Sequence, residues 1–164
     1  MNILEIKTEV KVYSKPSELG KEEQLLMKKA KEALQQAYAP YSKFHVGAAL
    51  LLDDGKIVTG SNQENTSFPL GLCAERVALA SKAANYPQQK VKAIAISVEN
   101  DIADSPASPC GMCRQALVEF GETDLVHLLE YFDKATGKPF DEKRTHAIVL
   151  SHPFAKCRTW QHNG

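Results

Sequence analysis

Strand-like and helix-like segments alternate along this chain, and the alternation constrains the fold more than any other feature of the sequence. The run from His45 to Leu52, HVGAALLL, is almost entirely apolar, DDG follows as a turn and KIVTG returns, so these residues read as a hairpin of strands. A second apolar run, VKAIAISV from Val91 to Val98, reads as a buried strand. Strands and helices that alternate at these lengths predict an α/β layered domain, with helices packed on a central sheet.

Three helices are expected around these strands. The periodic segment Glu22–Ala39 predicts the first, which Pro40 stops. The second is expected over about Cys73–Asn85 and the third over about Cys110–Phe120, each after a loop that contains proline or glycine.

The two ends of the chain carry weaker patterns. Residues Thr8–Tyr13, TEVKVY, alternate polar with apolar side chains and predict a short strand, and DLVHLLEYF after the third helix is also strand-like. The segment THAIVLSHPF predicts either a last strand on its Ala147–Leu150 core or a short helix, because so short a run has no decisive periodicity.

Length and charge restrict the class of protein. The 164 residues suit one domain, expected over residues 21–164, with residues 1–20 as an N-terminal extension. Basic and acidic residues both total 20, so no basic excess attracts the chain to nucleic acid. No run approaches the roughly 20 apolar residues that span a membrane, and the N-terminus interleaves Glu5, Lys7 and Glu9 with apolar residues, unlike a secretory signal. We therefore expect a cytoplasmic protein.

Two cysteine motifs carry the chemistry. They are C-A-E-R at Cys73–Arg76 and S-P-C-G-M-C-R at Ser108–Arg114, and each places its first cysteine where a predicted helix starts. Unpaired backbone NH groups and the helix dipole favour thiolates there. Three facing thiolates repel one another unless a cation lies between them. Zinc accepts three sulfur ligands and keeps a fourth tetrahedral position for water.

The residue two positions after Cys73 sharpens this reading. A lone CxxC also occurs in redox motifs and structural zinc sites, but Cys-x-Glu followed by Pro-Cys-x-x-Cys is the signature of zinc deaminases, whose glutamate moves protons and is not a ligand. The alternative is a closed structural zinc site in which Glu75 or a distant group supplies a fourth contact. The fourth cysteine, Cys157, has no such context and reads as a spare thiol.

Three blocks together resemble the cytidine deaminase family, in particular its small, homotetrameric branch with three cysteine zinc ligands. They are YAPYSKFHVGAALL, NQENTSFPLGLCAERVAL and SPCGMCRQALVEF. The resemblance implies a three-layer α/β/α sandwich with a central mixed sheet, one Zn²⁺ per subunit, and hydrolytic deamination of cytidine and 2′-deoxycytidine in pyrimidine salvage. It also implies a small nucleoside substrate, no nucleic-acid or membrane partner, and active sites shared within a homotetramer.

The resemblance also implies roles around the metal. Cys73, Cys110 and Cys113 correspond to the zinc ligands and Glu75 to the catalytic proton shuttle between water, the base and the departing amine. Arg76 corresponds to an arginine that hydrogen-bonds the thiolates. Three thiolates on Zn²⁺ leave a formal charge of −1, which a guanidinium would counter.

The substrate contacts follow from the same resemblance. Asn62 and Glu64 correspond to the pair that hydrogen-bonds the ribose 3′-hydroxyl, although the two residues could instead only cap and orient a loop. Phe44 corresponds to the aromatic that packs on the pyrimidine, and the backbone NH of Ala74 to a donor to the base carbonyl.

The sequence departs from the family pattern at two places. Phe68 stands where many members have a tyrosine that contacts the sugar across a subunit boundary. The usual E-L-L-P-x-x-F tail appears here as I-V-L-S-H-P-F; if the segments are equivalent, that tail is a short helix and Phe154 is offered to a neighbour's site.

Three other functions compete with this one. A deaminase of a modified cytosine nucleoside, such as an aminoacyl nucleoside antibiotic, is the nearest. Polynucleotide editing fits less well, because those deaminases usually have His at the position of Cys73. A non-catalytic zinc-binding domain would have little reason to keep Glu75 beside three cysteines.

Overall fold

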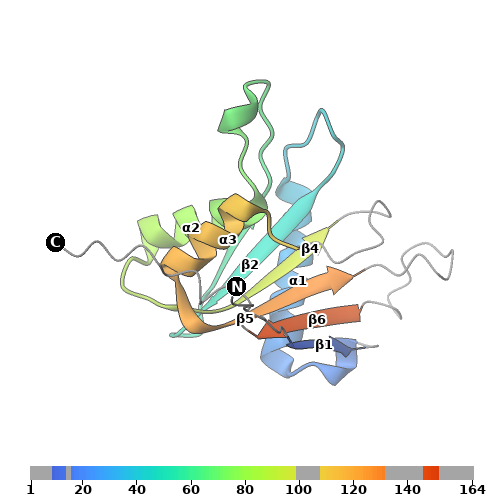
Figure 1. The fold of residues 1–164 in the computed structure, drawn as a ribbon, viewed down its shortest axis with the longest axis vertical. Helices are drawn as coiled ribbons and strands as arrows, with labels where there is room; N and C mark the ends of the chain where they lie inside the picture. The colour runs from blue at the N-terminus through green and yellow to red at the C-terminus, as the bar shows by residue number, and fades with distance from the viewer. Residues whose placement is uncertain (1–8, 14–15, 99–107, 132–145, 152–164) are drawn as a thin grey trace, which may run out of the picture.

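A mixed sheet forms the centre of the protein (Figure 1). The computed structural model describes residues 9–13, 16–98, 108–131 and 146–151. In these residues the strand order is β1-β6-β5-β4-β2-β3. The strands are β1 (Glu9–Tyr13), β2 (Val46–Leu52), β3 (Ile57–Ser61), β4 (Val91–Val98), β5 (Gly121–Tyr131) and β6 (His146–Ser151). Strands β4 and β5 run parallel and the other neighbours antiparallel.

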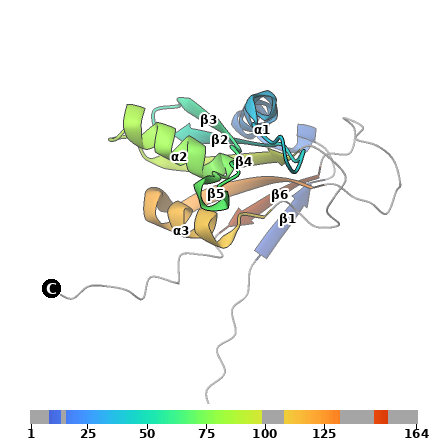
Figure 2. The same cartoon turned by 90° about the horizontal axis from the view of Figure 1, so that it is seen from above.

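Helices cover both faces of this sheet (Figure 2). Helix α1 (Lys21–Ala33) packs on one face, and α2 (Ala74–Asn85) and α3 (Gly111–Phe120) pack side by side on the other. Three 3-10 turns, η1 (Pro16–Glu18), η2 (Leu34–Gln36) and η3 (Phe68–Leu70), complete the helical elements of the described residues. The predicted three-layer α/β/α sandwich is confirmed.

The apolar composition of the central strands follows from this layering. Along β2, Ala48 and Leu50 face the core beneath α2 and α3, whereas Ala49 between them faces the core beneath α1. In β4, Ile94 likewise faces the core beneath α2 and α3, and Ala95 faces the core beneath α1. Because both faces of such a strand are buried, alternate positions cannot be polar, and the strand appears in the sequence as a continuous apolar run.

Two glycines set how closely the helices approach the sheet. A Cβ on Gly47 of β2 would lie 2.0 Å from the carbonyl oxygen of Ala30 in α1. A Cβ on Gly60 of β3 would lie 2.4 Å from the backbone nitrogen of Ala78 in α2. Both distances are far below van der Waals contact, so helix backbone rests directly on strand backbone on each face.

Most predicted elements are confirmed, with two differences. Helix α1 ends at Ala33, earlier than the predicted Ala39, because the chain tightens into η2 and then becomes extended at Ala37 (ψ 134°) ahead of Pro40. The short-helix alternative for the tail is wrong for His146–Ser151. This segment is strand β6, since it pairs on one side with β5 and on the other with β1.

Strand β1 lies within the predicted N-terminal extension and forms the edge of the sheet beside β6. Two residues discussed above, Phe154 and Cys157, lie outside the described residues. Among the described helices, none has the length and apolar character needed to cross a bilayer.

Candidate metal centre and active site

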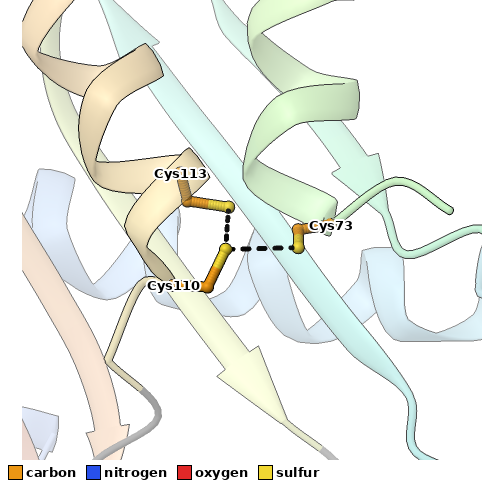
Figure 3. A group of neighbouring side chains, drawn as sticks. All are labelled: Cys73, Cys110 and Cys113. Carbon is orange, nitrogen blue, oxygen red and sulfur yellow. Dashed lines mark hydrogen bonds between the residues drawn. The ribbon is translucent and has the colours of Figure 1, made fainter. Parts of the chain in front are cut away.

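The three cysteines meet where the N-termini of α2 and α3 lie together (Figure 3). Cys73 is the N-cap of α2, with extended backbone (φ −71°, ψ 153°), and its carbonyl accepts the first helical bond from Val77. Cys110 directly precedes α3, and its carbonyl likewise accepts a bond from Arg114. Cys113 lies in the first turn of α3, so its thiol faces back toward Cys110.

The spacing of the three sulfurs suits zinc. The Sγ atoms of Cys73 and Cys110 are 3.8 Å apart, and those of Cys110 and Cys113 are 3.5 Å apart. All three lie within 4.8 Å of one another. Zn–S bonds of about 2.3 Å at tetrahedral angles hold sulfurs about 3.8 Å apart. The triad therefore fits one zinc ion with three protein ligands.

The protonation of the thiols also calls for a cation. Hydrogen bonds from Cys113, Arg76 and Cys110 lower the pKa of Cys73 to about 5, against the opposing effect of burial. The pKa of Cys113 is raised, first because its thiol donates to Cys73 and second because it is buried. Without a metal one thiolate forms and suppresses the next, so three thiolates require a positive charge between them.

Arg76 supplies a positive charge beside the sulfurs. Its Nη2 donates to the carbonyl of Gly71 at 2.8 Å and lies 4.0 Å from Cys73 Sγ. The bond to Gly71 fixes the guanidinium at the edge of the triad. Its Nε is buried without a hydrogen-bond partner among the described residues.

Glu75 is a buried carboxyl group in the first turn of α2. Its exposed fraction is 5%. Burial raises its pKa, and the neighbouring Cys73 thiolate raises it further. A carboxyl group whose pKa is moved up toward neutrality is suited to accept a proton and later return it.

A cavity of about 700 Å³ opens over these groups. The lining includes nearly all the residues expected from the sequence: Phe44, Asn62, Glu64, Phe68, Cys73, Ala74, Glu75, Arg76 and Cys110. Cys113 lies behind them and is fully buried. Ala74 is the first residue of α2, so its NH has no intrahelical acceptor and remains available as a donor at the cavity wall.

Asn62 and Glu64 hold the loop before β2. Asn62 Oδ1 accepts from the Val46 NH at 2.8 Å, and its Nδ2 donates to the Phe44 carbonyl at 2.9 Å. Glu64 Oε2 accepts from the backbone NH groups of Tyr41 and Ser42 at 3.0 and 3.2 Å. Both side chains thus orient the loop that carries Phe44, besides facing the cavity.

Several lining residues were not expected from the sequence. Tyr41, Ser42 and Gln63 line the cavity beside the expected residues, and Met112 lies on its rim with 64% exposure. All four residues stand within the three blocks already singled out, and Ser42 is two positions before Phe44. Which side chains of these blocks reach the cavity depends on how distant loops meet. Phe68, at the mouth, is 92% exposed.

The sequence model of a known protein family matches the region that contains this site. The model for the cytidine and deoxycytidylate deaminase zinc-binding region matches residues 20–129, about two thirds of the chain. The chain belongs to this family. The resemblance stated from the three blocks is confirmed, and both cysteine motifs, α2 and α3 fall inside the match.

Individual proteins named as cytidine deaminases are also similar to this chain. A cytidine deaminase from Halalkalibacterium halodurans is 47% identical over 103 residues, which cover 62% of this chain and 74% of the relative. A probable cytidine deaminase from Dictyostelium discoideum is 45% identical over 97 residues, covering 59% and 64%.

Solved structures share the fold. The crystal structure of cytidine deaminase from Burkholderia pseudomallei superposes with a TM-score of 0.57 at 46% identity, covering 64% of this chain and 81% of that one. The enzyme from Mycobacterium tuberculosis superposes with a TM-score of 0.57 at 41% identity, covering 63% and 80%.

Proposed function

We propose that this protein is a zinc-dependent deaminase that hydrolyses cytidine and 2′-deoxycytidine to uridine and 2′-deoxyuridine with release of ammonia. The observation that carries the proposal is the buried carboxyl group of Glu75 beside three zinc-spaced sulfurs, at the wall of a cavity large enough for a nucleoside. A closed structural zinc site would have no use for that cavity, since such sites take four protein ligands.

Zinc would be held by Cys73, Cys110 and Cys113, one ion per subunit. When bound, zinc acts as a Lewis acid that makes water nucleophilic near neutral pH. Arg76 would offset the excess negative charge of three thiolates, because its guanidinium lies beside Cys73 Sγ.

Glu75 would move the protons. It takes one proton from the attacking water and delivers it to N3 of the base as the water oxygen adds to C4. It then takes the remaining proton of the new C4 hydroxyl and delivers it to the amine, so that the C4–N bond breaks and the C4 carbonyl forms. One water is consumed and one ammonia is released. The burial of Glu75 supports this role, since its raised pKa suits a group that both accepts and donates.

The other cavity residues would hold the nucleoside. Phe44 would pack on the pyrimidine and the Ala74 NH would donate to the base carbonyl. Glu64 would accept from the sugar 3′-hydroxyl, and Asn62 would donate to it through the Nδ2 hydrogen that Phe44 does not use. Among the described lining residues the one cationic side chain is Arg76, so a free nucleoside fits better than a phosphorylated one.

A homotetramer with shared sites is part of the same proposal. Phe68 and Leu70 beside the cavity mouth are 92% and 65% exposed, and Met112 on its rim is 64% exposed. Apolar side chains gathered in this way are typical of surfaces that another chain covers. Phe68, and Phe154 outside the described residues, would then contribute to a neighbour's site, and dilution to monomers would abolish activity.

Two further expectations belong with the activity. We place the catalytic domain at residues 21–164, with residues 1–20 as an extension whose β1 pairs with β6. We place the enzyme in the cytoplasm, where thiols such as the three free cysteines stay reduced.

The test is the ultraviolet absorbance of cytidine and deoxycytidine incubated with purified protein. The wild type should remove the cytosine chromophore, and a Glu75→Gln variant with unchanged zinc content should be nearly inactive. Removal of zinc with a chelator should abolish activity, and its return should restore activity. If the protein binds zinc stoichiometrically but both nucleosides survive, the proposal is wrong, and modified cytosine nucleosides become the substrates to test.

A further inference from the structure

The loop between α1 and β2 contains an unusual turn at the cavity wall. Lys43 has φ 59°, and it is the one non-glycine residue with positive φ in the described part of the chain. For a residue with a side chain this left-handed conformation is energetically unfavourable, so neighbouring contacts must hold it. Phe44 directly follows Lys43, and therefore the turn decides where the Phe44 ring lies.

One hydroxyl group connects this turn to Glu64. Ser42 Oγ donates to Glu64 Oε1 in a short hydrogen bond and accepts from the Phe44 NH at 3.0 Å, spanning Lys43. Glu64 lies 22 residues further along the chain. The same carboxylate accepts from the backbone NH groups of Tyr41 and Ser42 through Oε2.

These bonds also decide which part of Glu64 is available to a ligand. A carboxylate oxygen has two lone pairs. Both lone pairs of Oε2 are used by the two backbone NH groups, whereas Oε1 receives only the Ser42 hydroxyl among the described residues. One acceptor position on Oε1 therefore remains for a substrate hydroxyl. The hydrogen bond from Ser42 also lowers the pKa of Glu64, which keeps the carboxylate an acceptor.

We propose that Ser42 is a positioning residue that couples the sugar-binding and base-binding sides of the cavity by fixing Glu64 Oε1 and the Phe44 backbone with one hydroxyl. This inference rests on the proposed function, because it takes Glu64 and Phe44 as substrate contacts. Ser42 acts through these two residues on substrate binding and takes no part in the chemical step.

The experiment compares the kinetics of cytidine deamination in four variants: Ser42→Ala, Glu64→Ala, the double variant, and Ser67→Ala as control. Ser67 is an exposed serine of the neighbouring loop whose hydroxyl makes no hydrogen bond within the described residues. Loss of a hydrogen bond to a charged group predicts a rise of about tenfold in KM for Ser42→Ala, with kcat within about twofold. In the Glu64→Ala background the same substitution should raise KM less than about threefold, because coupled residues are not additive.

Hydrogen exchange of the Phe44 amide tests the geometry independently of activity. It should be slow in the wild type and in Ser67→Ala, and faster in Ser42→Ala. The inference is overturned if Ser42→Ala leaves KM or Phe44 exchange unchanged, if kcat falls while KM does not rise, or if the effect on KM is equally large without Glu64. An inactive wild type would instead overturn the proposed function, and Phe44 exchange would still support or overturn the coupling by Ser42.

Discussion

Substitution of Gly60 by alanine tests whether the contact between α2 and β3 positions the active site. The added Cβ would lie 2.4 Å from Ala78 N and 2.6 Å from Ala74 O. These two atoms are donor and acceptor of one helical hydrogen bond, so neither can rotate away as a side chain would. Ordinary carbon contacts need about 3.5 Å, and α2 must therefore move off the sheet by about 1 Å.

This displacement reaches the metal centre because α2 begins at the site. Cys73 caps the helix and Glu75 lies in its first turn, whereas Cys110 directly precedes α3 and Cys113 lies in the first turn of α3. Ligand distances in metal sites hold to about 0.2 Å, so a 1 Å movement exceeds what the triad accommodates. We expect Gly60→Ala to lower the free energy of unfolding by about 1–3 kcal/mol. Zinc affinity should fall by at least about tenfold, and kcat/KM on cytidine by about 100-fold.

The assays are urea unfolding, zinc competition with a chromophoric chelator, and initial rates of deamination. Gly111→Ala is the matched control, because a Cβ at Gly111 meets no atom within 4 Å although Gly111 adjoins Cys110. It should leave all three quantities close to those of the wild type. A Gly60→Ala protein that loses stability but keeps wild-type zinc affinity and activity would refute the link between the helix position and the site.

Three further predictions follow from the site. Arg76→Ala should weaken zinc binding by about 10–100-fold in chelator competition, since the thiolates lose their compensating charge, and a wild-type affinity would contradict that role for Arg76. Ser42 and the backbone NH groups lower the pKa of Glu64, so protonation of Glu64 should raise KM only when the pH falls below the ordinary glutamate pKa of about 4.3. In Ser42→Ala the rise in KM should begin at a higher pH. Identical profiles of KM against pH in the two proteins would count against the hydrogen bond. Phe68→Ala should raise KM and weaken the oligomer on gel filtration while hardly changing subunit folding, because Phe68 is 92% exposed in the single chain; unchanged KM and size would leave no role for Phe68 across subunits.

The sequence by itself determined the local features of this protein. Apolar patterning and breaker residues, which act over a few neighbouring positions, predict the helix starts at Cys73 and Cys110, the hairpin of β2 and β3, and strand β4. The spacing of three cysteines and Glu75 pointed to zinc chemistry because ligand type and helix position determine what such groups can do. These local patterns define the end of a helix less well than its existence, and so the end of α1 was predicted too late.

Only the tertiary structure decided the features that depend on distant partners. Residues His146–Ser151 of the tail are a strand because β5 and β1 both pair with β6, and an apolar run of that length has no preference of its own. Strands β1 and β6 also lie outside the family match at residues 20–129. Burial of Glu75 arises from the packing of α2 against the sheet, and the bond from Ser42 to Glu64 arises from two loops that meet at one edge of the cavity. Desolvation and hydrogen bonding depend on which atoms are neighbours in space, and separation along the chain does not specify those neighbours.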